Sequence, residues 1–276
     1  MDIIQISKDI LTRLTKMDYE RNGGSSSERL IFPNKFPSEA KNKVITEKEL
    51  LKYTRISEQE LRFLFVEQFI KVTGKEFFYS VETPTEKKYR FGKTNEDIKP
   101  DITGRSASID MCVFKRDSDN KYNRFLNIEF KNENASKKSI SKDILKLMYE
   151  KENGAFILLL KNTDEGTLKS IFDKFSSSFD AHLLKDNWTD NPTTFIEIII
   201  LSLEEKRNKN GTPFLINRKI KKGDNLMDIF LFDGSLADIN EVKRNGWEIE
   251  PIEKVTMCNV EEELGMVAEE KVRYGK

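Results

Sequence analysis

Hydrophobic and polar residues alternate with a period of two in two neighbouring stretches of the chain, residues 108–114 and 125–132. This period is typical of β-strands that turn one face to a core. The polar residues 116–121 between them suit the turn of an antiparallel hairpin. The apolar face of the predicted hairpin carries Ile109, Met111, Val113, Leu126, Ile128 and Phe130.

Helical spacing marks one segment before the hairpin and another after it. The first begins at a capping box, with Ser57 at the N-cap and Glu60 at the third helical position, and Gly74 ends it. Its body is apolar on most sides, so we expect this helix to be largely buried. The second begins at Ser139 or Ser141. Its apolar face is formed by Ile140, Ile144, Leu147 and Met148, and its opposite side by Lys142, Lys146 and Tyr149.

Continuous apolar runs at residues 155–160 and 194–201 predict buried strands, with a helix over residues 164–179 between them. The succession of strand, helix and strand across residues 125–160 predicts a parallel crossover unit. Another strand, from residue 77, is expected to stop at Thr83-Pro84. Outlying elements are strands at 214–222, 228–232 and 247–255, a helix in 2–18 and a short helix within 38–53.

Together these elements predict an α/β protein with a mixed β-sheet flanked by helices. We expect residues 1–56 to form an N-terminal helical arm, residues 57–203 a core, and residues 204–276 a β-rich extension of the sheet. The arm is a candidate surface for a protein partner or for self-association into a homo-oligomer.

The amino-acid composition argues against several kinds of binding and active site. Because 47 basic residues balance 47 acidic ones, binding to nucleic acid would depend on local patches rather than on overall charge. Two cysteines do not support a disulfide framework. The one histidine, His182, gives little support to histidine-based nucleases, His–Cys zinc sites or Ser–His–Asp hydrolases. Since no long apolar segment or signal-peptide pattern occurs, we expect no membrane association and a cytoplasmic location.

The polar face of the predicted hairpin carries the candidate chemistry. Asp110 lies on the first strand, and Glu129 and Lys131 lie on the second. Pairing these strands would gather two carboxylates and one ammonium group on a single patch of sheet. Carboxylates are ligands that suit Mg²⁺, and a neighbouring lysine can hold or activate the nucleophile. The alternative is a surface hairpin whose charges are solvated or paired with one another.

An acid on one strand followed, after eighteen residues, by Glu129-Phe130-Lys131 resembles the active-site signature of the PD-(D/E)xK nuclease superfamily. The resemblance covers residues 57–203 and implies a restriction-endonuclease-like core that uses Mg²⁺ or Mn²⁺. It implies that Asp110, Glu129 and the carbonyl of Phe130 bind the metal, and that Lys131 positions the attacking water. Asp101, which follows Pro100, is a rival for the first acid, but its surroundings are typical of a loop.

The same resemblance implies a glutamate on the helix before the hairpin. Ser57-x-x-Glu60-x-Arg62 is similar to the first helix of the archaeal Holliday-junction resolvases of this superfamily, in which the glutamate completes the site. Glu60 is therefore a candidate catalytic residue, and Glu67 on the same polar stripe is its substitute. Judged from the residues alone, Glu60 caps the helix and Glu67 pairs with Lys71.

The resulting hypothesis is a Mg-dependent endonuclease that hydrolyses phosphodiester bonds in DNA, in restriction, repair or anti-phage defence. Two alternatives stay open. One is a catalytically inactive binding or regulatory module with the same fold, and the other is an RNase that uses the same residues. Residues 87–91, which interleave basic and aromatic side chains, suit contact with nucleic acid or, equally, the protected edge of a sheet.

Overall fold

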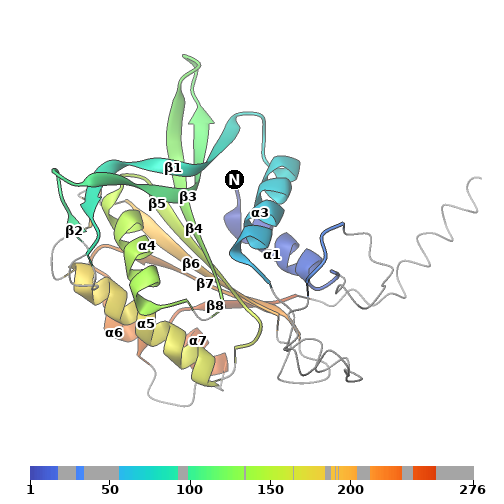
Figure 1. The fold of residues 1–276 in the computed structure, drawn as a ribbon. Helices are drawn as coiled ribbons and strands as arrows, with labels where there is room; N and C mark the ends of the chain where they lie inside the picture. The colour runs from blue at the N-terminus through green and yellow to red at the C-terminus, as the bar shows by residue number, and fades with distance from the viewer. Residues whose placement is uncertain are drawn as a thin grey trace, which may run out of the picture.

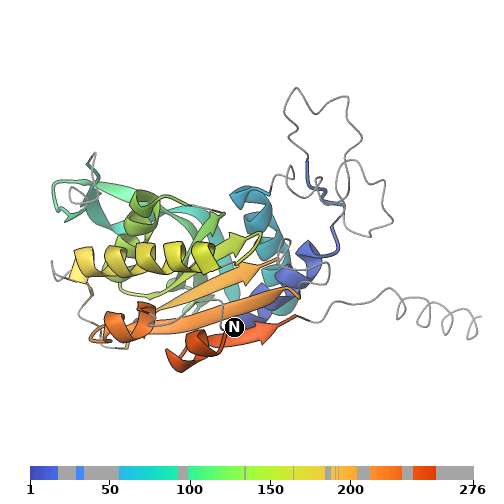
Figure 2. The same ribbon diagram turned by 90° about the horizontal axis from the view of Figure 1, so that it is seen from below.

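One mixed β-sheet with helices on both faces forms the described part of the protein. The computed structural model describes residues 1–17, 29–33, 56–92, 99–133, 135–163, 165–183, 188–189, 191, 193–203, 212–231 and 239–252. In these residues, eight strands follow the order β2-β1-β3-β4-β5-β6-β7-β8. Helices α1 and α3 lie on one face, and α4 and α5 lie on the other (Figures 1 and 2). The predicted α/β class with a mixed sheet is therefore confirmed.

The first half of the sheet is antiparallel. It contains β1 (Phe77–Arg90), β2 (Lys99–Pro100), β3 (Arg105–Arg116) and β4 (Tyr122–Asn132). β3 and β4 form the predicted hairpin, with Met111 opposite Ile128. β1 does not stop at Pro84 as predicted, because an irregularity between Pro84 and Lys88 lets the strand continue past a residue that lacks an N–H.

The second half begins with parallel strands. β4 pairs in parallel with β5 (Asn153–Leu160), and β5 with β6 (Phe195–Ser202). Helix α4 (Lys137–Tyr149) connects β4 to β5, as the sequence predicts, and α5 (Glu165–Leu183) connects β5 to β6. β7 (Phe214–Lys221) and β8 (Glu248–Pro251) then add antiparallel strands.

Two short helices, α6 (Leu226–Phe230) and α7 (Ile239–Arg244), lie between β7 and β8. The strand predicted at residues 228–232 is wrong, since α6 occupies most of it. A short apolar run does not distinguish a strand from a buried helical turn. Here Asn225 selects the helix, because its side chain accepts the N–H of Met227 at 3.1 Å and caps the first turn.

Helices α1 (Ile3–Leu14) and α3 (Glu58–Val72) share a core with one face of the sheet. The ring of Phe65 in α3 meets that of Phe130 in β4 edge to face, 5.3 Å between centroids. The expectation that α3 is largely buried is wrong, because Phe63 and Ile70 are 62% and 59% exposed. One face of α3 packs, and its outer face stays apolar without being covered by described residues. The short helix predicted within residues 38–53 lies outside the described residues.

On the opposite face, α4, α5 and α6 enclose a second apolar core. His182 is fully buried in the last turn of α5, within 2.9 Å of the hydroxyl of Ser141. This agrees with a histidine that packs at a helix end. In the part of the chain that the structure describes, no helix combines the length and apolarity needed to span a membrane.

Near the middle of the sheet, β3 separates from β4, and the candidate site lies at this separation. The described ladder between β3 and β4 ends at Met111 and Ile128, while the earlier residues of β3 continue to pair with β1. This first half of β3 leans over α4, where Lys146 donates to the carbonyl of Ser108 at 2.8 Å. Asp110 therefore lies at the point where β3 leaves β4.

Candidate active site

Charged and largely buried side chains gather where β3 and β4 separate. The register that pairs Met111 with Ile128, continued by one residue, places Asp110 opposite Glu129. Lys131 follows on β4, and α3 and α4 contribute from the two faces of the sheet. Within the described residues, this acid cluster consists of Glu58, Arg62, Glu82, Asp110, Glu129, Lys131, Asp143 and Lys146. Acids outnumber bases in it.

Asp110 joins the two strands and α3. Its Oδ2 accepts the backbone N–H of Phe130 at 2.8 Å, so the side chain replaces the ladder acceptor that β3 no longer supplies. Its Oδ1 accepts from the guanidinium of Arg62 in α3 at 2.7 Å. Both carboxylate oxygens therefore have partners, and the residue is only 9% exposed.

Glu129 is the most deeply buried acid of the cluster, with no exposed surface. Its Oε1 lies 2.5 Å from the ammonium group of Lys146. Its Oε2 has no hydrogen-bond partner among the described residues. Burial and the nearby charge of Asp143 raise the pKa of Glu129 well above its ordinary value, although Lys146 acts in the opposite direction. Glu129 therefore keeps its proton to a higher pH than an exposed glutamate does.

Lys131 is held by groups from three elements. Its ammonium group donates to the carbonyl of Phe130 at 2.8 Å, and lies 2.8 Å from Asp143 and 3.5 Å from Glu58. Burial alone would lower the pKa of Lys131, but Asp143 and the other nearby acids raise it above its ordinary value. Lys131 is thus charged at neutral pH. The carbonyl of Phe130, an expected metal ligand, is here an acceptor for Lys131.

Helix α4 supplies Asp143 and Lys146, which the sequence did not assign to the site. Lys146 contacts Asp143 and Glu129 and is 5% exposed. Its predicted place on the outer side of the helix is wrong, because the first half of β3 covers that side. Burial opposes the charge of Asp143, yet Lys146 and Lys131 outweigh it and lower the pKa of Asp143. An opposite-charge pair one turn apart on the helix after Glu129-x-Lys131 is the signal that could have revealed these residues.

The structure does not bring Glu60 or Glu67 to the acid cluster. The carboxylate of Glu60 accepts the N–H of Ser57 at 2.5 Å and closes the capping box. Glu67 pairs with Arg13 of α1 at 2.8 Å rather than with Lys71. The glutamate of α3 that reaches the cluster is Glu58, which contacts Arg62 at 2.9 Å. Because all three glutamates lie within three turns of one helix, the choice among them depends on the crossing of α3 over the sheet.

Asp101, the rival for the first acid, lies apart from the cluster. It accepts the N–H of Thr103 at 2.9 Å and pairs with Arg90 at 2.9 Å, close to the short strand β2. These contacts organise a turn at the edge of the sheet, and the hydrogen bonds from Thr103 lower the pKa of Asp101. Asp110, and not Asp101, therefore shares its surroundings with Glu129 and Lys131.

The cluster fits a hard divalent cation in the chemistry of its donors. Carboxylate oxygens suit Mg²⁺, and the excess of acids together with the unpaired Oε2 of Glu129 would favour an added positive charge. The present positions do not form a finished coordination shell. Among the described residues, no group of three or more His, Cys, Asp or Glu side chains is arranged to hold a metal ion. A cation would have to exchange with ion pairs that the lysines and Arg62 now make.

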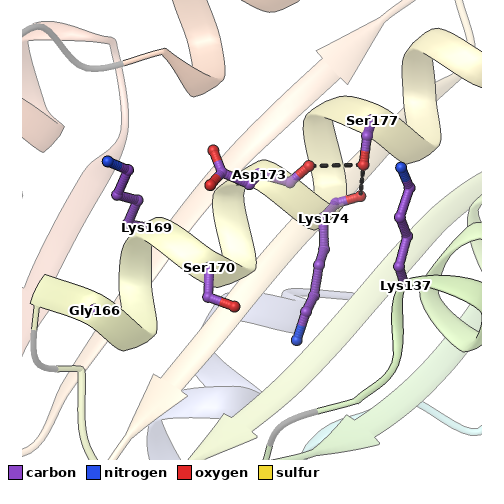
Figure 3. A pocket seen from close by; sticks show the side chains of 7 residues that line it. All are labelled: Lys137, Gly166, Lys169, Ser170, Asp173, Lys174 and Ser177. Carbon is purple, nitrogen blue, oxygen red and sulfur yellow. Dashed lines mark hydrogen bonds between the residues drawn. The ribbon is translucent and has the colours of Figure 1, made fainter.

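A separate surface pocket of about 540 Å³ lies against α5, beside the first turn of α4. It is lined by Lys137, Gly166, Lys169, Ser170, Asp173, Lys174 and Ser177. Figure 3 shows the ammonium groups of Lys137, Lys169 and Lys174 pointing in different directions. Lys174 donates to the carbonyl of Ala135 at 3.0 Å. These lysines do not converge on one anion, so the acid cluster remains the candidate active site.

Comparisons with protein-family models, with curated proteins and with solved structures found no significant match to this chain.

Proposed function

We propose that this chain is a metal-dependent endonuclease that hydrolyses phosphodiester bonds, with DNA as its substrate. The observation that carries the proposal is the convergence of Asp110, Glu129 and Lys131 from adjacent strands, with a buried oxygen of Glu129 that has no partner among the described residues. Leaving a carboxylate oxygen buried and unpaired is costly, and such costs are concentrated at functional sites.

The topology around the site supports a restriction-endonuclease-like core. Three antiparallel strands, β1, β3 and β4, lead into the parallel strands β5 and β6 through the crossover helix α4. The candidate residues come from the adjacent strands β3 and β4 and from the helices α3 and α4. At the point where β3 leaves β4, regular structure fixes the charged groups of the site, and Glu58 and Glu82 are its more exposed members.

Asp110 and Glu129 would hold the metal ion. Mg²⁺ bound there would withdraw charge from the scissile phosphate and lower the pKa of a bound water. Asp110 is held by the N–H of Phe130, and this contact can persist when its other oxygen exchanges Arg62 for the metal. Such preorganisation reduces the reorganisation needed in the transition state.

Lys131 would act on the phosphate as a fixed positive charge. Its raised pKa means that it carries its proton at neutral pH, so it cannot take a proton from the attacking water. Asp143 and Glu58 hold its ammonium group at 2.8 and 3.5 Å and act as positioning residues. The ammonium group would stabilise the negative charge that develops on the phosphate oxygens.

A binding or regulatory module that no longer uses the site is the second candidate. Its support is the internal neutralisation of the cluster, in which Arg62, Lys131 and Lys146 each contact two or more of the acids. A charge network of this kind can exist for structural reasons alone. The two candidates differ in one measurable property, which is affinity for a divalent cation.

The test compares Asp110→Asn with Asp101→Asn. Both aspartates contact one arginine, at 2.7 and 2.9 Å, so loss of that ion pair is common to both variants. Binding of Mn²⁺ is measured by calorimetry, and cleavage is measured on DNA and RNA of the same sequence. We expect wild type and Asp101→Asn to bind Mn²⁺ and cleave DNA, and Asp110→Asn to do neither.

Each other outcome excludes a specific part of the proposal. Cleavage of RNA alone would make the chain an RNase with the same site. Absence of Mn²⁺ binding by folded wild-type protein would support the binding module. Equal loss in both aspartate variants would show that Asp110 has no special role.

A further inference from the structure

Glu82 adopts a backbone conformation that its side chain disfavours. It lies inside β1 with φ at 49°, in the left-handed region. Its neighbours are regular, since Val81 pairs with Met111 and Thr83 pairs with Ile109 on β3. The distortion is therefore confined to one residue. The register places that residue opposite Asp110, at the same level of the sheet as Glu129.

The distorted backbone presents the Glu82 carboxylate to Arg62. Glu82 Oε1 accepts from one terminal nitrogen of this guanidinium at 2.6 Å. The other terminal nitrogen contacts Asp110 at 2.7 Å and Glu58 at 2.9 Å. Three carboxylates from β1, β3 and α3 thus converge on a single positive group. The guanidinium now neutralises these carboxylates, so a divalent cation that bound beside them would have to exchange with some of its contacts.

A second observation points to a cation beyond those in the chain. Glu129 Oε2 is fully buried and lacks a hydrogen-bond partner within the described residues, although the neighbouring Asp110 already contacts Arg62. On the solvent side of Asp110, Glu82 is 58% exposed and Glu58 is 28% exposed at the side chain. A cation arriving from solvent would therefore meet these two carboxylates before it reached Asp110.

We propose that Glu82 is a further carboxylate ligand of the divalent cation, beside Asp110, an inference that rests on the proposed function. Glu82 is the better candidate of the two exposed acids. Glu58 also contacts Lys131 and lies in the first turn of α3, where the helix dipole already favours a negative charge. Within the described residues, the Glu82 carboxylate contacts Arg62 and no other charged group.

Glu67 provides a matched control. Its side chain is 58% exposed, as is that of Glu82, and it also contacts a single arginine, Arg13, at 2.8 Å. Glu82→Gln and Glu67→Gln therefore remove the same charge and weaken the same type of ion pair. Glu82→Gly is a third variant. It removes the carboxylate and also relieves the backbone strain at residue 82, since glycine adopts positive φ readily.

The experiment measures Mn²⁺ affinity by calorimetry and thermal unfolding of the metal-free protein for all these variants. We expect Glu82→Gln and Glu82→Gly to weaken Mn²⁺ binding by about 10- to 100-fold, and Glu67→Gln to change it by less than about 2-fold. We expect Glu82→Gly to unfold at or above the wild-type temperature, because it relieves the left-handed backbone.

The outcomes separate this inference from the proposed function. Wild-type Mn²⁺ affinity in Glu82→Gln, with loss of binding in Asp110→Asn, would overturn the role of Glu82 and leave the nuclease proposal intact. Folded wild type that binds no Mn²⁺ would overturn both. A fall in the unfolding temperature of both Glu82 variants that matches their loss of affinity would make Glu82 a structural residue and also overturn the inference.

Discussion

Two glutamates beside helix α4 are buried to nearly the same extent, but their carboxylates differ in their hydrogen-bond partners. Glu129 faces the helix from β4 with 0% exposure, and Glu150 ends the helix with 1% exposure. The carboxylate of Glu150 accepts the N–H groups of Glu86 and Lys87 at 3.0 and 3.1 Å, and the hydroxyl of Tyr89 at 2.9 Å. It fastens the irregular part of β1 to α4. Glu129 has one ammonium neighbour and one oxygen without a described partner.

The comparison separates an acid whose burial is compensated by hydrogen bonds from one whose burial we attribute to the proposed metal site. Hydrogen bonds to a charged acceptor compensate its removal from water, and Glu150 has them on both oxygens. Glu129 instead lies among Asp143 and Asp110, which raise its pKa further after burial has done so. Changes around Glu150 should therefore lower stability, whereas changes around Glu129 should lower activity and should not lower stability at neutral pH. Four predictions test this division, from the largest expected effect to the smallest.

Of the four changes, Lys131→Met should have the largest effect, and this effect should be on the rate of cleavage. It removes the ammonium group beside Asp143 and keeps an unbranched side chain, so cleavage under single-turnover conditions should fall by about 10²–10³-fold. Mn²⁺ should still bind. Lys137→Met, at an exposed position in the first turn of α4, is the control and should cleave as wild type does. A Lys131→Met protein with wild-type rates would remove this residue from the mechanism.

Glu150→Gln should give the largest effect on stability. The amide keeps one acceptor oxygen and turns a donor towards groups that also donate, so the free energy of unfolding should fall by about 2–4 kcal/mol. Urea unfolding measures this change, and cleavage per folded molecule should not alter. Glu86→Gln is the control, because the Glu86 side chain is 42% exposed and its backbone N–H remains. Lost activity without lost stability would contradict the division.

Whereas Glu150→Gln should lower stability, Glu129→Gln should raise it relative to wild type as the pH increases. Since folding raises the pKa of Glu129, the folded state binds the extra proton, and wild-type stability decreases as pH rises from the unfolded pKa through the folded one. The amide does not titrate. In urea unfolding, the free energy of unfolding of the variant should rise relative to that of wild type by on the order of 1 kcal/mol between about pH 5 and about pH 8. A constant difference across this range would mean that Glu129 is not shifted.

Tyr89→Phe should give the smallest effect. Tyr89 is fully buried, and the variant deletes one of the hydrogen bonds to Glu150 while keeping the ring. The free energy of unfolding should fall by about 0.5–1.5 kcal/mol in urea. Tyr122→Phe, at a residue that is 55% exposed, should change it by less. A loss in Tyr89→Phe as large as that in Glu150→Gln would show that the hydroxyl carries most of the contact.

Local patterns in the sequence predicted the elements that hold the candidate site. Alternation along residues 108–114 and 125–132 predicted the hairpin, and with it the placement of Asp110 opposite Glu129. The capping box at Ser57 predicted the start of α3. These features depend on neighbours within a few residues, which is the range over which spacing and capping carry information.

The rest of the acid cluster depends on contacts between distant segments. Lys146 has the spacing of a solvent-facing helical residue, and only the lean of β3 over α4 buries it. Glu82 owes its position to a left-handed backbone before Pro84, which the sequence indicated as the end of a strand. Glu58 replaces Glu60 beside Lys131 because of the angle at which α3 crosses the sheet. None of these features is encoded in a local period.

β8, the last strand of the sheet among the described residues, has a consequence for contacts between copies of this protein. It has four residues, it pairs with β7 on its inner side, and it ends in Pro251, which has no N–H to donate. Its two glutamates are engaged within the molecule, since Glu248 accepts from Asn217 and Glu250 pairs with Lys8. A strand from another molecule would therefore have only a short stretch of backbone with which to pair. Growth of the sheet from chain to chain, the first step towards fibrous aggregation, is thereby discouraged at this edge.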